Sequence, residues 1–305
     1  MSSDKPRVGF IGLGLMGHGI AKNLVSKGFP LTVRVHRNRK PAEDILAAGA
    51  TEVKTSAELA RASDIVIMCV TGSPQIEEIV YGDGGEMSGI MSVAREGLIV
   101  IDTSTAEPAS TAKIRDDFAK KGTKYVDAPL ARTPKEAEEG RLNTMVGADD
   151  ATFAQLKPVL SAYCENVIHV GPPGHGHMMK LINNFIAQSI ATATAEACAT
   201  CAKSGVSIRK LHEIVSAGAV NSGIFQLLVG KMLEGDMAGL KFTLVNAMKD
   251  MRYYMHFAES LPVSALVGGA VHQSLVNANL MGFGDKYVPS LIEAQEKLAG
   301  VKIRS

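Results

Sequence analysis

The sequence lacks an excess of either charge. Its 305 residues include 32 Lys and Arg against 31 Asp and Glu, which gives a formal net charge of +1, and no basic or acidic block interrupts it. A protein that binds nucleic acid or an anionic membrane through charge normally carries such a block. The composition therefore argues against nucleic acid and against a membrane as the main partner.

Cysteines are also few in this sequence, and its first residues form no apolar run. The four cysteines are scattered, and Cys198 and Cys201, although spaced as CxxC, fall on an Ala-rich stretch of helical pattern. Small core residues are therefore favoured over a redox or metal pair, and no metal site is expected. No apolar signal segment precedes Arg7, which favours a reduced, cytoplasmic protein.

The chain is long enough for two domains. Short apolar runs that fit buried strands lie at 7–11, 31–35, 64–70, 97–102, 124–129, 144–147 and 166–170. After Pro172 and Pro173 only helical patterns follow, with starts near Ser207 and Phe242 and another after Pro262.

These patterns predict an α/β protein with a discontinuity in the middle. A Rossmann-type, dinucleotide-binding domain is expected at residues 1–170. An all-α domain is expected at residues 171–305, joined to the first by a long inter-domain helix.

A glycine motif follows the first predicted strand and opens a helical pattern. It reads Gly12-Leu13-Gly14-Leu15-Met16-Gly17. A strand, a GxGxxG turn and a helix form the dinucleotide-binding fingerprint, in which the glycines allow a tight turn, close approach of a pyrophosphate, and helix–strand packing. The phosphates would rest on free N–H groups at the helix N-terminus. All six residues are predicted to bind the cofactor.

The end of the second predicted strand favours NADP over NAD. An NAD site normally has Asp or Glu about 20 residues after the glycines to bind the ribose 2′-hydroxyl, and here no acid occurs before Glu43. Arg37 and Asn38 lie instead in a basic turn, where Arg37 is able to pair a 2′-phosphate in a bidentate manner. A merely solvated basic turn is the alternative reading, and NAD remains open as a cofactor.

Two further strand ends carry polar residues. Val70 and Thr71 end one strand, and Ser104 and Thr105 follow another. Ligands of open α/β sheets collect outside the carboxyl ends of the strands, so these four residues are predicted to contact the nicotinamide half of the cofactor. Ser and Thr are equally natural there as helix caps.

The longest helical pattern begins near residue 175 and carries Lys180 and Asn184 on one face, because they are four residues apart. From Leu181 to Ala202 the only charge is Glu196, so this helix is predicted to be buried on all sides. Its polar residues exclude a membrane span. A solvated lysine is the ordinary reading, but desolvation and the positive end of the helix dipole both disfavour an ammonium here, which makes Lys180 a candidate for proton transfer.

Four motifs together resemble the β-hydroxyacid dehydrogenase family. They are the glycine motif, Asp127-Ala128-Pro129 with the loop after it, the stretch from Gly174 through Lys180 to Asn184, and Lys249-Asp250. The resemblance covers essentially the whole chain. It implies hydride exchange between NAD(P) and a small hydroxy acid or aldehyde, and a helical domain that mediates a homodimer or homotetramer.

The resemblance also implies roles for single residues. Lys180 would be the catalytic acid/base, Asn184 would orient the substrate, and Lys249 would reach toward cofactor and substrate. A histidine among 169, 175 and 177 is the alternative acid/base. A non-catalytic NADP(H)-binding or sensing module is the alternative function, although the presence of both Lys180 and Asn184 argues against it.

The loop after Asp127 departs from the family. The family usually continues with a small residue, Ser, Gly and Gly, which hold the substrate carboxylate, whereas this chain has Leu130, Ala131, Arg132 and Thr133. An Arg-Thr pair here resembles the sulfolactaldehyde reductase branch. Ala131, Arg132 and Thr133 are therefore predicted to bind an anionic substrate group, with Arg132 as a bidentate clamp. A solvent-facing Arg132 is the alternative.

Overall fold

The computed structural model describes residues 5–36, 38–82, 85 and 87–304. It divides into two compact units, Met1–Lys180 and Leu181–Ser305. The division falls inside one continuous helix, α8 (His175–Lys203), ten residues after the boundary expected at residue 170. Where the functional domains divide stays a prediction.

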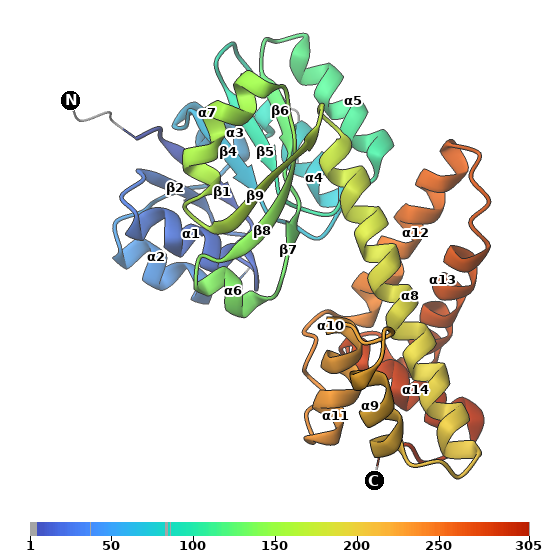
Figure 1. The fold of residues 1–305 in the computed structure, drawn as a ribbon. Coiled ribbons are helices and arrows are strands. Elements are labelled where there is room, and N and C mark those ends of the chain that lie inside the picture. The colour runs from blue at the N-terminus through green and yellow to red at the C-terminus, as the bar shows by residue number, and fades with distance from the viewer. Residues whose placement is uncertain (1–4, 37, 83–84, 86, 305) are drawn as a thin grey trace. The chain divides into compact units, whose positions relative to one another are not determined.

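The first unit is built on a single sheet (Figure 1). Within the described residues it has nine strands: β1 (Val8–Ile11), β2 (Leu31–Arg34), β3 (Thr51–Val53), β4 (Ile65–Met68), β5 (Ile99–Asp102), β6 (Lys124–Asp127), β7 (Leu130–Ala131), β8 (Leu142–Gly147) and β9 (Cys164–Gly171). The order is β3-β2-β1-β4-β5-β6-β8-β7, with β9 beside β8. The strands from β3 to β6 in this order are parallel, and β8 runs antiparallel to β6 and β7. The order reverses between β1 and β4, which is where open α/β sheets bind their ligands.

All seven strands predicted from the sequence are confirmed, and the Rossmann-type fold with them. The prediction missed β3 and β7. β3 has three residues, two of them exposed, and β7 has only two residues. Neither is long enough to show a period-two pattern.

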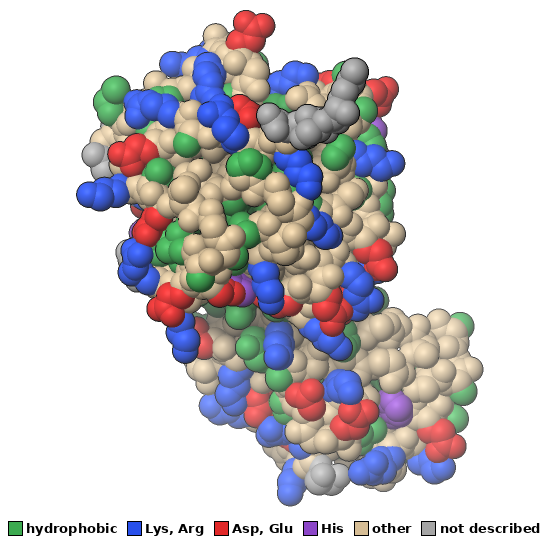
Figure 2. Space-filling view, turned by 90° about the vertical axis from the view of Figure 1, so that its left-hand side faces the viewer, with side chains coloured by type: hydrophobic (Ala, Val, Ile, Leu, Met, Phe, Trp, Pro, Cys, Tyr) green, Lys and Arg blue, Asp and Glu red, His purple; other side chains and the backbone are tan. Residues whose placement is uncertain are grey.

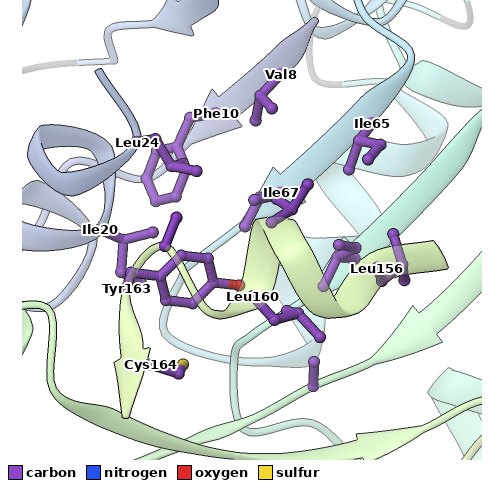
Figure 3. Close-up of a cluster of buried hydrophobic side chains, with 14 of the residues drawn as sticks. Val8, Phe10, Ile20, Leu24, Ile65, Ile67, Leu156, Leu160, Tyr163 and Cys164 are labelled. Atoms are coloured by element: carbon purple, nitrogen blue, oxygen red, sulfur yellow. The ribbon is translucent and has the colours of Figure 1, made fainter. Parts of the chain in front are cut away.

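Two hydrophobic cores cover the two faces of this sheet. The helices of the first unit before α8 are α1 (Gly17–Ser26), α2 (Glu43–Ala47), α3 (Ser56–Arg61), α4 (Ser73–Tyr81), α5 (Pro108–Ala119), α6 (Pro134–Glu138) and α7 (Asp150–Leu160). In β4, Ile65 and Ile67 face a core shared with α1 and α7 (Figure 3), whereas Val66 and Met68 face a core shared with α3, α4 and α5. This alternation explains why the strands read as unbroken apolar runs.

The second unit is helical. It contains the rest of α8 together with α9 (Ile208–Ala217), α10 (Gly223–Phe225), α11 (Lys231–Leu233), α12 (Leu244–Ser260), α13 (Leu266–Ala278) and α14 (Leu291–Ala299). Among its described residues there is no strand, only an isolated bridge between Thr243 and Tyr287. The predicted helix starts near residues 207 and 242 and after 262 are confirmed. Leu228, Met251 and Leu275 are fully buried in its core.

One prediction about α8 is wrong. The helix is not buried on all sides, because Met179, Ile182 and Ile186 are 42%, 39% and 54% exposed. Positions three and four apart share a helix face, so these residues form an apolar stripe on the surface of the single chain. Within the described residues, no helix is both long and apolar enough to cross a membrane.

Basic and acidic side chains both lie scattered over the face of the molecule drawn in Figure 2. That distribution agrees with the balanced composition of the sequence.

Candidate functional site

A cleft of about 950 Å³ opens where β1, β2 and β4 end. The predicted cofactor residues that line it are Gly12, Leu13, Gly14, Leu15, Asn38, Val70 and Thr71. Met16, Gly17, Ser104 and Thr105 are not part of the lining, and Arg37 lies outside the described residues. The cleft therefore stands at the reversal of strand order, as the glycine motif led us to expect.

The three glycines of the motif have three different surroundings. Gly12 has a φ of +105°, and a Cβ there would lie 2.1 Å from the carbonyl oxygen of Cys69. A Cβ on Gly17 would lie 1.9 Å from the carbonyl oxygen of Gly12, whereas a Cβ on Gly14 would meet nothing within 4 Å. Packing therefore leaves no room for a side chain at Gly12 or Gly17, whereas Gly14 has open space around it beside the N-terminus of α1. This cradle fits a pyrophosphate.

The far end of the cleft is basic. Arg34, the last residue of β2, lines it together with His36 and Lys40. Arg34 donates from Nη1 to the hydroxyl of Ser56 at 2.8 Å, and Arg39 donates from both guanidinium nitrogens to the carboxylate of Glu52, at 2.8 Å each. Arg34 was not among the cofactor residues predicted from the sequence. It lies at the end of the strand where an NAD site would have an acid, and that position could have identified it. Arg34, His36 and Lys40 fit a 2′-phosphate.

His18, on the first turn of α1, joins three helices at the edge of this cleft. Its Nδ1 lies 2.5 Å from Glu138 of α6, and its Nε2 lies 3.0 Å from Asp44 of α2. Ionised carboxylates only accept hydrogen bonds, so these two contacts favour the imidazolium form, in which both ring nitrogens donate. Burial opposes that charge, but the hydrogen bonds to Glu138 and Asp44 outweigh it and raise the pKa of His18.

In the predicted substrate loop, Arg132 and Thr133 form hydrogen bonds with neighbouring residues. Arg132 has a φ of +83°, rare for a residue with a side chain. Its Nη1 donates to the carbonyl oxygen of Arg141 at 2.5 Å and to the carboxylate of Glu165. Thr133 precedes α6, and its N–H and hydroxyl donate to Glu136 at 3.0 and 2.5 Å. Ala131 ends β7.

A buried polar network links the strand ends behind the cleft. The N–H of Val70 donates to the hydroxyl of Ser104 at 3.0 Å, and the N–H of Ser104 donates to Oδ1 of Asp102 at 2.9 Å. Oδ2 of Asp102 accepts from the hydroxyl of Tyr125 at 2.8 Å. Burial and the charge of Asp102 raise the pKa of Tyr125, so its hydroxyl stays protonated as the donor. Two predicted cofactor residues, Val70 and Ser104, are thus tied together.

The same network reaches the first turn of α8. His177 is completely buried, with Nε2 3.7 Å from Oδ2 of Asp102 and Nδ1 2.7 Å from the hydroxyl of Thr111. The carboxylate of Asp127 accepts from the N–H groups of Gly174 and His177, at 2.6 and 2.8 Å. Lys180 follows on the next turn and is half-buried.

The alternative acid/base histidines have other environments. His177, being buried, lacks solvent access. His169 stacks on Phe153 with a centroid distance of 4.5 Å and lies 2.7 Å from the carbonyl oxygen of Ala148. His175 is exposed.

In the second unit, Asp250 brings two predicted residues together. The amide of Asn184 donates to Oδ2 of Asp250 at 2.6 Å, and Nζ of Lys249 lies 2.9 Å from Oδ1 of the same carboxylate. Asp250 is 2% exposed. The Lys249-Asp250 motif was visible in the sequence, but no role for Asp250 was predicted from it. Across the described residues, no group of three or more His, Cys, Asp or Glu side chains is arranged to hold a metal ion.

Comparison with known proteins covers nearly the whole chain. The protein family described as the NAD-binding domain of 6-phosphogluconate dehydrogenase matches residues 7–171. The family described as the NAD-binding part of NADP-dependent 3-hydroxyisobutyrate dehydrogenase matches residues 174–293. The chain is 30% identical to 2-(hydroxymethyl)glutarate dehydrogenase of Eubacterium barkeri over 97% of each chain. It is 28% identical to 3-sulfolactaldehyde reductase of Escherichia coli strain K12, over 96% of this chain and 97% of that protein.

A solved structure shows the same fold. The 3-hydroxyisobutyrate dehydrogenase of Mycobacterium tuberculosis with L-serine superposes with a TM-score of 0.84 at 22% identity. The match covers 95% of this chain and 98% of that one.

Proposed function

Because this chain belongs to the β-hydroxyacid dehydrogenase family, we propose that Lys180 is its general acid/base and that Ala131, Arg132 and Thr133 bind the acid group of its substrate. The chain is an oxidoreductase that transfers a hydride between NAD(P)(H) and a small hydroxy acid or semialdehyde. Its cofactor is NADP, with NAD as a possible second cofactor. The non-catalytic alternative has no support among its relatives.

One observation carries the proposed role of Lys180. The α8 turn that precedes this lysine is fixed by buried polar contacts of Asp127 and His177, and His177 faces the network that includes Val70 and Ser104. A proton donor must be held in a fixed direction relative to the reacting carbonyl. This buried anchoring supplies such a fixed direction.

The cofactor has a fitting set of residues in the cleft. The backbone of residues 12–15 would hold the pyrophosphate at the start of α1, and Arg34, His36 and Lys40 would hold the 2′-phosphate. The bound dinucleotide supplies the hydride acceptor or donor.

The proton follows the hydride through the protein's own groups. In the reducing direction the Lys180 ammonium donates a proton to the carbonyl oxygen of the aldehyde. Asn184, one turn further along α8, uses one amide N–H on Asp250 and has a second N–H to orient the substrate oxygen. Lys249, paired with the same Asp250, is proposed to contact cofactor and substrate.

Arg132 is proposed to select a second acid group on the substrate. Among the described residues its hydrogen bonds all leave from Nη1, so the Nε–Nη2 edge is left for bidentate binding of an anion. A small semialdehyde with a carboxylate or a sulfonate at its far end fits this edge, and one relative is named a 3-sulfolactaldehyde reductase.

The test is oxidation of NADPH with a panel of aldehydes that includes sulfolactaldehyde, succinate semialdehyde, glyoxylate and methylmalonate semialdehyde. We expect turnover with at least one of them, and we expect Lys180→Ala to abolish it while NADPH still binds. Rates of the variant within about tenfold of wild type would remove Lys180 from proton transfer, since such groups usually contribute more.

We further propose a homodimer or homotetramer in the cytoplasm. The exposed apolar residues Ile182 and Ile186 support association. All four cysteines are free thiols, as a reduced compartment would have them. Light scattering of the purified protein tests the assembly, and a monomer at micromolar concentration would contradict it.

A further inference from the structure

Asp127 occupies a niche shaped for its carboxylate. The side chain is 0% exposed, and its two oxygens accept the N–H groups of Gly174 and His177 at 2.6 and 2.8 Å. A Cβ on Gly147 would lie 2.6 Å from Oδ1, and a Cβ on Gly176 would lie 2.8 Å from Oδ2. Two glycines therefore leave just enough room for this carboxylate.

The carboxylate sits at the positive end of α8. Free N–H groups at a helix start carry a partial positive charge, and a buried anion there offsets it. The sequence predicted that the helix dipole disfavours an ammonium at Lys180. Asp127 acts in the opposite direction, because its negative charge at the helix start offsets the dipole that disfavours the ammonium.

The side chain of His177 holds the same turn from another direction. Its ring lies against Thr111 of α5 and Asp102 of β5, and a completely buried ring cannot shift without opening the core. The turn before Lys180 is thus tied to β6 through Asp127 and to α5 through Thr111, and the His177 ring of this turn lies beside Asp102 of β5.

We propose that Asp127 is a positioning residue for Lys180, which fixes the direction of the first turn of α8 and keeps the ammonium available for proton donation. This inference rests on the proposed role of Lys180. The covalent step is unchanged, since the proton still passes from Lys180 to the substrate oxygen.

The main test is Asp127→Asn, which keeps the size of the side chain, removes its charge and replaces one of the two accepting oxygens by an amide NH2. We expect kcat for aldehyde reduction to fall at least about tenfold, because an acid catalyst out of place loses most of its effect. We also expect the alkaline limb of the pH profile of kcat to move to lower pH, because the helix start that carries Lys180 loses its compensating negative charge. Dissociation of NADPH, measured by fluorescence, should change by less than about threefold.

Two further variants make the outcome decisive. Asp116→Asn removes an exposed carboxylate of α5 and should leave both kcat and the alkaline limb unchanged. Gly147→Ala crowds only the Asp127 side chain, so it should lower kcat without moving the limb, because the charge stays. If Asp127 had a purely structural role, Asp127→Asn would lower the melting temperature and the folded fraction but would leave the alkaline limb of the kcat profile in place.

The proposal is overturned if folded Asp127→Asn enzyme keeps its alkaline limb at the wild-type pH. If that variant does not fold, Gly147→Ala decides, and an unchanged kcat overturns the proposal. An inactive Lys180→Ala with a normal Asp127→Asn rejects this inference alone, whereas an active Lys180→Ala rejects the proposed function as well.

Discussion

The glycine turn after β1 and the loop after β7 both follow strands of the same sheet, yet they are built in opposite ways. In the glycine turn, positions with strained or crowded backbone carry glycine, as at Gly12 with a φ of +105°. In the loop, Arg132 holds a φ of +83° with a long charged side chain, which is unfavourable for any residue but glycine. In the proposed function, the turn serves backbone contact with a phosphate, whereas the loop keeps a side chain at a cost in stability. Such strain supports the proposed role of Arg132 in binding the substrate.

The largest expected effect separates two glycines of the turn. Gly12→Ala places a Cβ 2.1 Å from the Cys69 carbonyl in a left-handed conformation, so we expect it to lose about 3 kcal/mol or more of unfolding free energy. Gly14→Ala meets no atom within 4 Å of its new Cβ, so its stability should be unchanged. Its affinity for NADPH should nevertheless fall at least about tenfold, because the methyl occupies the space of the pyrophosphate.

Urea unfolding and NADPH fluorescence check both glycine variants. A Gly14→Ala protein that binds NADPH like wild type would show that the open space beside α1 does not hold the phosphates. The glycines of this turn would then serve only the packing of the protein.

Arg132→Gly should separate function from stability in the loop. Relief of the positive φ should stabilise by about 1–2 kcal/mol. Loss of the partly exposed pair with Glu165 should cost about 0–1 kcal/mol, and loss of the hydrogen bond to the Arg141 carbonyl about 0.5–1.5 kcal/mol. The variant should therefore unfold at about the same urea concentration as wild type. Because charge-assisted hydrogen bonds contribute about 1.5–3 kcal/mol, KM for the anionic aldehyde should rise about 10- to 100-fold. An unchanged KM would mean that Arg132 faces no substrate.

A smaller effect is expected when the partner of Arg132 is changed. Glu165→Gln removes the charge that orients Nη1 but leaves the Arg141 carbonyl bond in place. We expect KM to rise about two- to fivefold with kcat retained, in line with partly exposed ion pairs. The matched control is Glu139→Gln, since Glu139 pairs with Arg141 rather than with Arg132. Equal effects of both variants would mean that the loop responds to net charge and not to the orientation of Arg132.

The two regions also differ in how much of them the sequence could predict. The glycine motif can be recognised within six residues of the chain, so a local pattern was enough to find the cleft, although the atom that crowds Gly12 belongs to the distant Cys69. Arg132 pairs with a residue 33 positions away, and Asp127 meets Gly174 across 47 positions. Such partners are chosen by the tertiary fold, and no local pattern contains them. The same limit explains why burial on all sides was wrongly predicted for α8, because apolar composition does not tell which face the rest of the chain covers.

The smallest expected effect concerns His18, which connects the two regions: it lies beside the glycine turn and bonds Glu138 of α6, the helix after the Arg132 loop. Burial lowers its pKa, but the hydrogen bonds to Glu138 and Asp44 outweigh burial and raise the pKa above the ordinary value of 6.5.

A raised pKa means that the stabilisation by His18 is fully present below the unfolded-state pKa and is lost as pH rises through the folded-state pKa. The unfolding free energy of wild type relative to His18→Gln should therefore be greater at about pH 5.5, below the unfolded-state pKa, than at about pH 9. Urea unfolding of both proteins at the two pH values measures this difference, with His175→Gln, an exposed histidine of α8, as the control. A difference that is the same at both pH values would mean that the His18 ring carries no charge in the folded protein, and that its link between the cofactor cleft and α6 does not depend on protonation.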